Sequence, residues 1–593
     1  MQETYVIPQR FFKNVRQYAD KPALLSKING HYRPVHYREL GENVKALALI
    51  LDSWGIKHGD RVAIMSDNRE EWIMADLSAV SIGLISVPIY PTLSPKQVGE
   101  LLNHSNPRVL YISTLELLEK VGASGYKFEK IVIFDKFQNK GIEWIQDVIS
   151  RGKEILQQDS GRFDQLMEKV IGKDLACINY TSGTTGVPKG VMLSHENFVR
   201  DVDNSVKIIQ IYAGDVFLSF LPLSHVLERM GGYYVPMILG ATIGFAESTE
   251  TVVQNMAEVQ PTILISVPRL FEKIYGTVMS GIMSGSALKK SIFYWALKAG
   301  KARMEHEING KPLNAWQRRK IKIADRLVFS KLQQKTGGKL QRFVSGGAPL
   351  SAEIAEFFYC AGLKIYEGYG LTETSPVITV NGPGHVRLGS VGVAIPETEF
   401  KIAEDGEILV KGPQVMQGYY KSPEMTREVI DEEGFLHTGD IGHFDDDGFL
   451  YITDRKKNIL VTAGGKNVAP QPIEEALKLS PYIAESVLIG DRRQFISALI
   501  VLDQVAVKKW AGENKIPFEP YEEFICNEKL YQLIEREIDK QTESFSRFEK
   551  IKKFRIIPRD FTIEAGELTP SLKVKKKEVL GKYSRLVEEM YSE

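Results

Sequence analysis

The chain has 593 residues, which is too long for one hydrophobic core, so we expect several packed layers or domains. Lys plus Arg equal Asp plus Glu at 75 each, and this balance argues against a nucleic-acid-binding protein and against a general attraction to membranes. The three cysteines, Cys177, Cys360 and Cys526, are widely spaced and have no second Cys or His at ligand spacing, which argues against a disulfide framework and a zinc site.

The N-terminal residues show no basic region followed by an apolar stretch, and no uncharged apolar run reaches about 18 residues. The low cysteine content favours a reducing compartment. We therefore expect a cytoplasmic protein that is soluble or at most peripheral on the inner face of a membrane.

The first part of the chain predicts alternating strands and helices. Apolar residues between 11 and 19 share one helical face, and Asn29 and Gly30 then predict a hairpin turn. Strands are predicted at 61–65, 84–89, 109–112 and 131–134, with amphipathic helices between them. This alternation is typical of a layered α/β domain.

The run from Tyr180 to Gly190 follows a predicted strand and surrounds one lysine with small, hydroxyl and glycine residues. Glycines let backbone amides turn toward one point, hydroxyls add donors, and Lys189 adds a positive charge, so the composition predicts a phosphate cradle. It differs from the P-loop of NTPases, because Pro188 precedes the lysine and Gly190 follows it. The candidate residues are Thr181, Ser182, Gly183, Thr184, Thr185, Gly186 and Lys189.

This run resembles the signature loop of the acyl-adenylate-forming ligases, the superfamily of acyl-CoA synthetases, luciferases and peptide-synthetase adenylation domains. A second motif, Leu-Pro-Leu-Ser-His-Val-Leu-Glu-Arg at 221–229, resembles a segment of long-chain acyl-CoA synthetases. A lone histidine before an apolar segment is usually a packed or surface residue. The resemblance instead implies that His225 lies beside the reacting carboxylate.

The segment 281–340 is rich in Lys and Arg. Two interpretations remain open: a solvated pair of helices, or a face that docks on anionic lipid or acyl-CoA. A long insertion at this place resembles the long-chain branch of the superfamily rather than its acetate or aryl ligases.

Two further motifs, at 345–350 and 366–373, match the nucleotide site of the family. Small residues leave room for a flat purine, Tyr369 offers a stacking face, and Thr372 reaches the α-phosphate. Glu373 suits Mg²⁺, which prefers carboxylate together with phosphate oxygens. A tyrosine-rich strand core is disfavoured because the glutamate ends the motif. The nucleotide-binding candidates are Gly346, Gly347, Ala348, Pro349, Glu367, Gly368, Tyr369, Gly370 and Thr372, and the metal candidates are Glu373 and Thr184.

Asp440 offers a carboxylate at a predicted strand end, which suits the two ribose hydroxyls, and the family gives this Asp that role with Arg455 beside it. The acidic segment 445–448 lacks the ligand spacing of an EF-hand, so a hairpin turn is predicted. Lys457 matches the family hinge about which the small C-terminal domain rotates.

Two motifs follow this hinge. Gly464, Gly465 and Lys466 resemble the loop that lines the thiol tunnel after rotation, and the glycines allow close approach of a pantetheine arm. Lys573 lies in a basic run, where a lysine is usually only solvated, but the resemblance implies that it is catalytic. Many members have glycine where this chain has Leu572, although leucine is familiar in the long-chain branch.

The resemblance extends from about the first helix to Lys573. It implies an α/β fold with a large, multi-layer N-terminal domain at 1–456, containing the ATP and fatty acid sites, and a small mobile α+β domain at 457–593. The implied enzyme is a long-chain fatty acyl-CoA synthetase. A fatty carboxylate attacks the α-phosphorus of MgATP and expels pyrophosphate, and the thiol of coenzyme A then displaces AMP. The implied catalytic residues are Lys573, Glu373, His225 and Lys189.

Three alternatives remain. Acyl transfer to an acyl carrier protein is not separated from transfer to coenzyme A, because both acceptors present the same thiol arm. A phosphotransferase is disfavoured by the missing Gly-Lys-Ser/Thr and kinase signatures. A non-catalytic lipid or nucleotide binder is disfavoured by the presence of Glu373 and Lys573. The sequence does not predict the acyl chain length, because the tunnel floor depends on tertiary packing.

Overall fold

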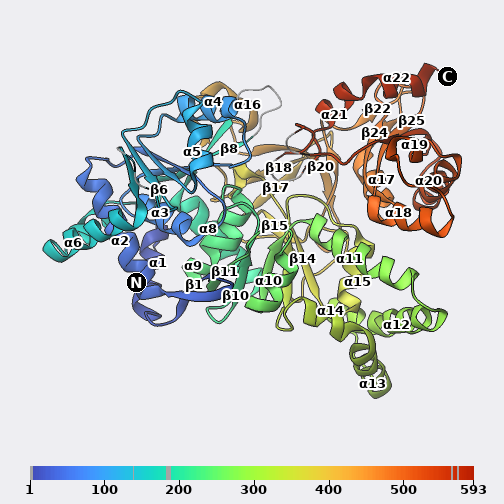
Figure 1. The fold of residues 1–593 in the computed structure, drawn as a ribbon, viewed down its shortest axis with the longest axis horizontal. Helices are drawn as coiled ribbons and strands as arrows, with labels where there is room; N and C mark the ends of the chain where they lie inside the picture. Colours follow the sequence, from blue (N-terminus) through green and yellow to red (C-terminus); the bar gives the residue numbers. More distant parts are fainter. Residues whose placement is uncertain are drawn as a thin grey trace.

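The computed structural model describes residues 4–137, 139, 141–181, 189–562, 565–569 and 573–592. A large N-terminal lobe, blue to light orange in Figure 1, lies beside a smaller C-terminal lobe, darker orange to red. Across the described ranges, no helix has both the length and the apolar character needed to cross a bilayer.

The predicted alternation of strands and helices builds a first large sheet, in the order β19-β9-β8-β4-β3-β5-β6-β7. Along β3, Val62 and Ile64 face the core shared with α2 and α3, whereas Ala63 and Met65 face a second core shared with α4 and α5. Both faces of this strand are therefore covered, as is typical of parallel α/β sheets. The strands are β3 (Arg61–Met65), β4 (Ile85–Ile89), β5 (Val109–Ile112), β6 (Lys130–Ile133), β7 (Ile142–Trp144), β8 (Leu175–Thr181), β9 (Lys189–Ser194) and β19 (Gly418–Tyr419). The helices are α2 (Tyr37–Ser53), α3 (Glu70–Val80), α4 (Pro95–Ser105), α5 (Leu115–Gly122), α6 (Ile145–Gln158) and α7 (Arg162–Met167).

A second large sheet has the order β16-β15-β14-β13-β12-β10-β11-β1-β2. Its central strands pair in parallel, and β1 and β2 form the predicted hairpin, with positive φ at Asn29 and Gly30. The strands are β1 (Pro22–Ile28), β2 (His31–His36), β10 (Val216–Ser219), β11 (Thr242–Phe245), β12 (Ile263–Ser266), β13 (Arg342–Ser345), β14 (Lys364–Tyr369), β15 (Thr379–Val380) and β16 (Val393–Ala394). The helices are α1 (Ile7–Gln17), α8 (His195–Ile209), the π-helix η1 (Glu228–Tyr234), α9 (Val235–Leu239), α10 (Val252–Val259), α15 (Ala352–Cys360) and the 3-10 helix η3 (Thr372–Thr374).

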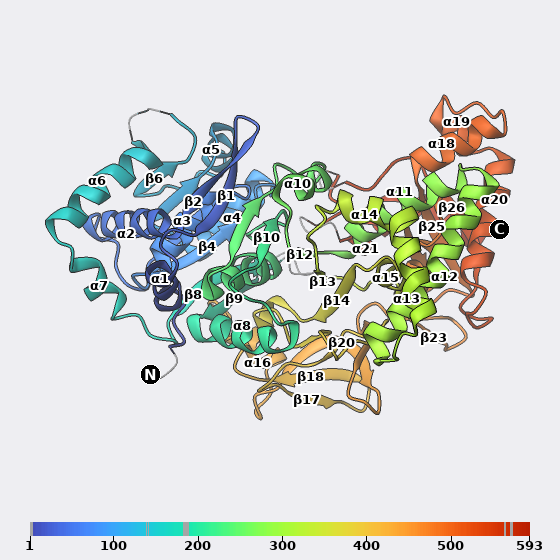
Figure 2. The ribbon, with the colours of Figure 1, turned by 90° about the horizontal axis from the view of Figure 1, so that it is seen from below.

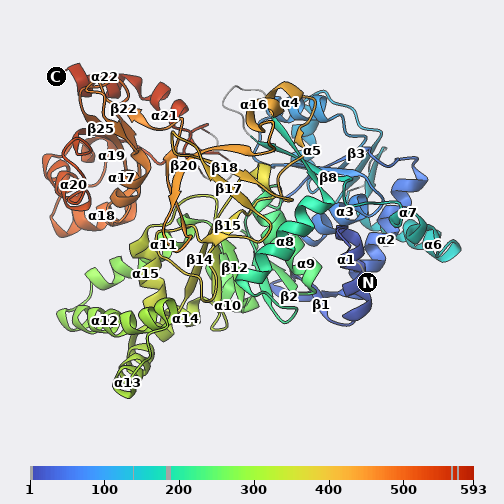
Figure 3. The same ribbon diagram turned by 180° about the vertical axis from the view of Figure 1, so that it is seen from behind.

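The basic segment 281–340 is mostly helical. Its neighbourhood contains α11 (Pro268–Met283), α12 (Ala287–Asn309), α13 (Ala315–Ala324), the π-helix η2 (Asp325–Phe329) and α14 (Ser330–Lys335). A Cβ atom at Gly300 would lie 2.4 Å from the carbonyl oxygen of Cys360, so glycine is required for the close packing of α12 on α15. In Figures 1 and 3, α13 projects from the lower edge of the molecule.

A small antiparallel sheet, β17-β18-β20-β21, lies below β14 in Figure 2. Its elements are β17 (Glu399–Ile402), β18 (Glu407–Lys411), β20 (Leu436–Phe444) and β21 (Leu450–Arg455), with α16 (Pro423–Val429) preceding β20. The hairpin turn predicted at 445–448 is confirmed, because the amide of Gly448 donates to the carbonyl of Asp445 at 3.0 Å.

The C-terminal lobe has its own mixed sheet and two hydrophobic cores. Ala498 and Ile500 face the core that includes α17 and α20, whereas Leu499 and Val501 face the core that includes α21 and α22. The elements are β22 (Leu460–Val461), β23 (Asn467–Val468), β24 (Ile483–Ile489), β25 (Ile496–Leu502), β26 (Ile551–Ile557), α17 (Pro470–Leu477), α18 (Gln504–Glu513), α19 (Tyr521–Phe524), α20 (Glu528–Gln541), α21 (Lys576–Lys582) and α22 (Ser584–Ser592). This lobe and the larger α/β lobe confirm the predicted fold class.

Candidate active site

The predicted nucleotide motifs meet at one edge of the second sheet. Because β13 and β14 pair in parallel with Ser345 opposite Glu367, the segments that leave their carboxyl ends lie side by side. A Cβ atom at Gly370 would lie 1.6 Å from the carbonyl oxygen of Pro376, so only glycine fits there. Gly346, Gly347, Ala348 and Pro349 follow β13, Gly368 begins the pairing of β14 with β15, and Thr372 begins η3.

Tyr369 and Arg455 both contact the carboxylate of Asp440. The Tyr369 hydroxyl donates to Oδ2 of Asp440 at 2.7 Å, and Nε of Arg455 lies 3.2 Å from Oδ1. Burial raises the pKa of Asp440, while Arg455 and Tyr369 act in the opposite direction. The three residues link β14, β20 and β21 into one polar group.

The prediction that Asp440 ends a strand is wrong. Asp440 lies inside β20, which pairs with β18 at Leu436, His437 and Ile441 and with β21 from Asp440 to Phe444. The preceding Gly439 has φ of +72° and the pairing shifts register after Ile441, so the strand bends at this point without ending.

Glu373 accepts a hydrogen bond from Tyr419, a residue that the sequence analysis missed. The Tyr419 hydroxyl donates to Oε1 of Glu373 at 2.7 Å, and Nζ of Lys189 lies 5.1 Å from the Tyr419 ring centroid. Tyr419 reaches this position because β19 pairs with β9, which begins at Lys189. No local motif marks it in the sequence.

The glycine loop itself lies largely outside the described residues. Thr181 and Lys189 are its described ends, and they face each other across the antiparallel pair of β8 and β9. The predicted residues Ser182, Gly183, Thr184, Thr185 and Gly186 lie between them, outside the described ranges.

The surroundings of Glu373 fit a magnesium ion bound together with phosphate. Tyr419 donates a hydrogen bond to only one carboxylate oxygen of Glu373, and within the described ranges the other oxygen accepts no hydrogen bond. Those ranges contain no group of three His, Cys, Asp or Glu residues arranged for a metal. One carboxylate with substrate phosphates is nevertheless a usual environment for Mg²⁺.

His225 lies in the segment between β10 and η1. The amide of Leu227 donates to Nδ1 of His225 at 3.2 Å, so in the neutral ring the proton is on Nε2. Burial and, to a smaller extent, the nearby charge of Lys573 together lower the pKa of His225 to about 4. At neutral pH the ring is therefore an uncharged hydrogen-bond donor at Nε2.

Lys573 comes from the C-terminal lobe yet lies within electrostatic range of His225, Asp440 and Arg455. Its amide donates to the hydroxyl oxygen of Thr569 at 3.0 Å, and its carbonyl accepts the amide of Thr569 at 2.8 Å. Loss of hydration and the charge of Arg455 lower the pKa of Lys573 to about 8, while Asp440 acts in the opposite direction. The chain thus brings together predicted site residues from both lobes.

The predicted thiol-tunnel residues are not part of this group. Gly464, Gly465 and Lys466 are exposed in the turn between β22 and β23, and the Lys466 ammonium lies 5.9 Å from the ring centroid of Phe548 in the same lobe. Lys457 is also exposed, between β21 and β22. Its neighbour Lys456 is anchored to Glu407 at 3.0 Å.

Glu367 is buried at the boundary between the lobes. Burial and, to a smaller extent, the charge of Glu475 on α17 together raise the pKa of Glu367 to about 8. The carbonyl of Glu367 accepts the amide of Asn381 at 2.8 Å. This residue therefore supports the end of β14 and contributes a neutral carboxyl near neutral pH.

Comparisons with known proteins agree with this architecture. The family described as AMP-binding enzyme matches residues 11–420, and the family described as AMP-binding enzyme C-terminal domain matches residues 457–593. The adenylation domain of a carboxylate reductase from Mycobacterium chelonae has the same fold, with 22% identity, a TM-score of 0.77 and coverage of 99% of this chain and 91% of that one. The chain therefore belongs to the AMP-binding enzyme family.

Two relatives are similar over nearly the whole chain. Long-chain-fatty-acid–CoA ligase FadD15 of Mycobacterium bovis is 35% identical over 590 residues, covering 98% of this chain and 96% of that protein. The peroxisomal long chain acyl-CoA synthetase 7 of Arabidopsis thaliana is 31% identical over 634 residues, covering 100% of this chain and 87% of that protein.

Proposed function

We propose that this AMP-binding enzyme is a long-chain fatty acid–CoA ligase. It joins a fatty carboxylate to the α-phosphorus of ATP with release of pyrophosphate, and then transfers the acyl group to the thiol of coenzyme A with release of AMP. The observation that supports this function best is the meeting of Lys573 with His225 and Asp440. The names of the relatives support the fatty acyl substrate and coenzyme A.

In the first half-reaction, His225 and Lys573 act on the reacting carboxylate and phosphate. The Nε2–H of the neutral His225 ring donates to one oxygen of the fatty carboxylate and orients the other toward the α-phosphorus. The ammonium of Lys573 stabilises negative charge that develops on the α-phosphate oxygens. No covalent bond to the enzyme is needed, because the carboxylate is itself the nucleophile.

The nucleotide is bound by the N-terminal lobe. The segments after β13 and β14 accommodate the adenine, with the ring of Tyr369 beside it, and Asp440 accepts hydrogen bonds from the ribose hydroxyls with Arg455 nearby. Thr372 bonds the α-phosphate, and the loop from Thr181 to Lys189 bonds the outer phosphates. These groups act mainly by positioning ATP for in-line attack.

Glu373 is the residue that would bind the divalent cation, with Thr184 as a further ligand. The oxygen of Glu373 that Tyr419 does not bond provides the carboxylate ligand. We propose Mg²⁺, which when bound neutralises the phosphate charge and favours loss of pyrophosphate. Tyr419 fixes the carboxylate orientation, and Lys189 adds positive charge close by.

In the second half-reaction the thiol of coenzyme A attacks the acyl-adenylate carbonyl and AMP leaves. We propose that the domain at 457–593 rotates about Lys457 relative to the domain at 1–456, so that Gly464, Gly465 and Lys466 replace Lys573 at the reacting centre. The exposure of this turn in the present arrangement supports a second arrangement. Acyl carrier protein is a weaker candidate acceptor, because the relatives are named as CoA ligases.

We also propose a cytoplasmic location with peripheral contact with the inner face of a membrane. The balanced net charge of the chain gives no general attraction to lipid, so such contact requires a local basic surface. The segment 281–340 is the candidate.

The test is an acyl-chain series in which pyrophosphate release is measured first, followed by thioester formation with coenzyme A and with acyl carrier protein in parallel. We expect pyrophosphate release that depends on a long-chain fatty acid, and thioester formation with coenzyme A. Absence of fatty-acid-dependent pyrophosphate release would reject the ligase. Preference for the carrier protein would reject only the acceptor.

A further inference from the structure

The projecting helix α13 and the following η2 expose a row of large apolar side chains. Trp316, Ile323 and Leu327 are 62%, 42% and 54% exposed. Their separations of seven and four residues place them on one side of a helix, while Ile321 and Ala324 are buried against the protein. We call Trp316, Ile323 and Leu327 the α13 stripe. Large exposed apolar side chains grouped in this way usually mark an interaction surface.

Basic side chains flank the α13 stripe. Arg319 and Lys322 are exposed on α13, Arg326 is exposed on η2, and within the described ranges none of the three forms an ion pair. The ammonium of Lys320 lies 5.4 Å from the ring centroid of Trp316. These charges are therefore available to an external partner.

The charge of this part of the chain is unlike that of the whole. Between residues 281 and 340 there are 14 Lys and Arg but only 3 Asp and Glu, whereas the complete chain has 75 of each kind. Because the chain is neutral overall, this segment is a strong local concentration of positive charge. A partner attracted here is expected to be negatively charged.

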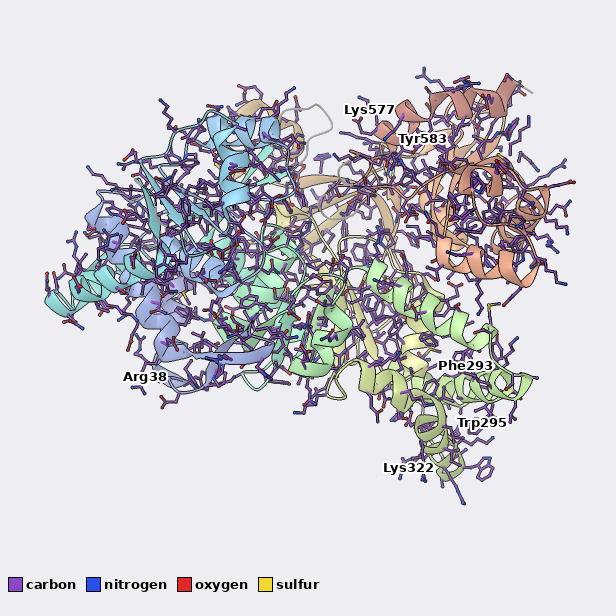
Figure 4. All side chains as sticks on the ribbon, viewed as in Figure 1. Arg38, Phe293, Trp295, Lys322, Lys577 and Tyr583 are labelled. Carbon is purple, nitrogen blue, oxygen red and sulfur yellow. The ribbon has the colours of Figure 1, made fainter. Side chains whose placement is uncertain are left out.

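The neighbouring helix α12 also exposes large apolar side chains and a lysine. Leu288 is 70% exposed, and Tyr294 and Trp295 are also exposed, with Lys298 on the same helix. In Figure 4, Trp295 and Lys322 lie on the projecting helices, at the opposite end of the view from Lys577 and Tyr583 of the C-terminal lobe. The surface is therefore separate from the part of the C-terminal lobe that contains α21.

We propose that the α13 stripe docks on a bilayer that contains anionic phospholipids. Tryptophan and branched aliphatic side chains enter the boundary between head groups and acyl chains, while Arg and Lys pair with head-group phosphates and extend their aliphatic stems along the apolar surface. This inference rests on the peripheral membrane contact proposed above and names the surface responsible. A bilayer also concentrates long-chain fatty acids, so docking brings the enzyme to its proposed substrate.

The test is co-sedimentation of the full-length protein with phosphatidylcholine vesicles, with and without phosphatidylglycerol. We expect binding only with phosphatidylglycerol, weakened by added salt. The double variant Arg319→Gln/Lys322→Gln should bind about thirtyfold more weakly, and Trp316→Ser/Ile323→Ser about tenfold more weakly. The controls are Tyr212→Ser and Val505→Ser, whose exposed side chains lie outside α12 and α13 and which should bind as the unmodified protein does.

Pyrophosphate release with a water-soluble shorter acid, measured without vesicles, should be unchanged in both double variants. If vesicle binding behaves as expected but no acid supports pyrophosphate release, the proposed function fails and the docking surface stands. The proposed surface is wrong if the unmodified protein does not bind anionic vesicles. It is also wrong if both double variants bind these vesicles as tightly as the unmodified protein does. If the variants instead lose self-association with unchanged vesicle binding, the stripe contacts a second copy and the proposal is wrong.

Discussion

The two lobes contribute to the candidate site in different ways. In the N-terminal lobe the polar groups are already paired with one another, as Tyr369 with Asp440 and Tyr419 with Glu373. The ammonium of Lys573, from the C-terminal lobe, forms no ion pair within the described ranges, and its pKa is shifted by loss of hydration and by the charges of Arg455 and Asp440. The N-terminal half is thus preorganised, whereas the C-terminal half depends on how the two lobes are placed.

The packing of the C-terminal lobe is compatible with the proposed rotation as one unit. Its two hydrophobic cores consist of its own residues, so the lobe has the internal packing of a separate domain. The chain enters it just after Lys456, which Asp405 and Glu407 anchor to the small antiparallel sheet. In the proposed mechanism, a backbone rotation at Lys457 would move Lys573 and leave the paired groups of the N-terminal lobe in place.

The largest effect is expected from Lys573→Ala. Pyrophosphate release should fall about a thousandfold, because the variant removes a cation that stabilises charge developing on phosphate. Transfer from preformed acyl-adenylate to coenzyme A should fall much less, since the thiol attacks a neutral carbonyl. Lys577→Ala is the control, because Lys577 is exposed on the same lobe and has no assigned role. Equal losses in both half-reactions would indicate a structural role for Lys573.

Glu373→Gln alters the preorganised groups that the N-terminal lobe contributes to the site. The amide keeps an acceptor for Tyr419 but loses the negative charge, so we expect a folded protein whose magnesium-dependent pyrophosphate release falls about a hundredfold. Tyr419→Phe is the comparison variant and should lose only severalfold, because the carboxylate remains. Near-normal release by Glu373→Gln at saturating Mg²⁺ would mean that the metal is bound elsewhere.

Lys457→Pro addresses the connection between the lobes. Proline fixes φ near −65° and removes an N–H, so it should disfavour one of the two arrangements by about a hundredfold. If the adenylating arrangement is retained, acyl-adenylate should still form while thioester release becomes slow in single-turnover measurements. Lys457→Ala keeps the backbone freedom and should behave as the unmodified protein. Unchanged rates in both half-reactions of Lys457→Pro would place the hinge elsewhere.

The features that the sequence could predict are those that depend on residues close together in the chain. Local patterns found the strands at 61–65 and 109–112 and the hairpin at Asn29 and Gly30, because apolar periodicity and turn chemistry act over a few residues. The motifs after β13 and β14 were also local, and parallel pairing brings them together.

The missed features depend on contacts between distant segments. Tyr419 reaches Glu373 only because β19 pairs with β9, and no sequence pattern near residue 419 predicts this pairing. Asp440 was expected at a strand end, yet pairing with β18 and β21 continues the strand to Phe444. The environment of Lys573 likewise depends on the docking of one lobe on the other.

The smallest effect is expected from pH. Near neutrality Lys573 is mostly protonated, and because its pKa is lowered to about 8, it loses its proton as the pH rises through that value. The single-turnover rate of adenylation at limiting ATP should therefore fall, approaching tenfold per pH unit above about 8. His225, with its pKa lowered to about 4, stays neutral throughout this range and adds no change of its own.

Two variants test whether Lys573 is the group whose titration lowers the adenylation rate above pH 8. Lys573→Arg keeps its cation at all accessible pH values, so its lower rate should not decline above pH 8, whereas Lys577→Arg should decline as the unmodified protein does. The pKa of Glu367 is also raised to about 8, and its ionisation beside Glu475 would loosen the contact between the lobes. A decline that persists in Lys573→Arg but disappears in Glu367→Gln would assign the pH dependence to the boundary between the lobes, and Lys573 would then not be the titrating group.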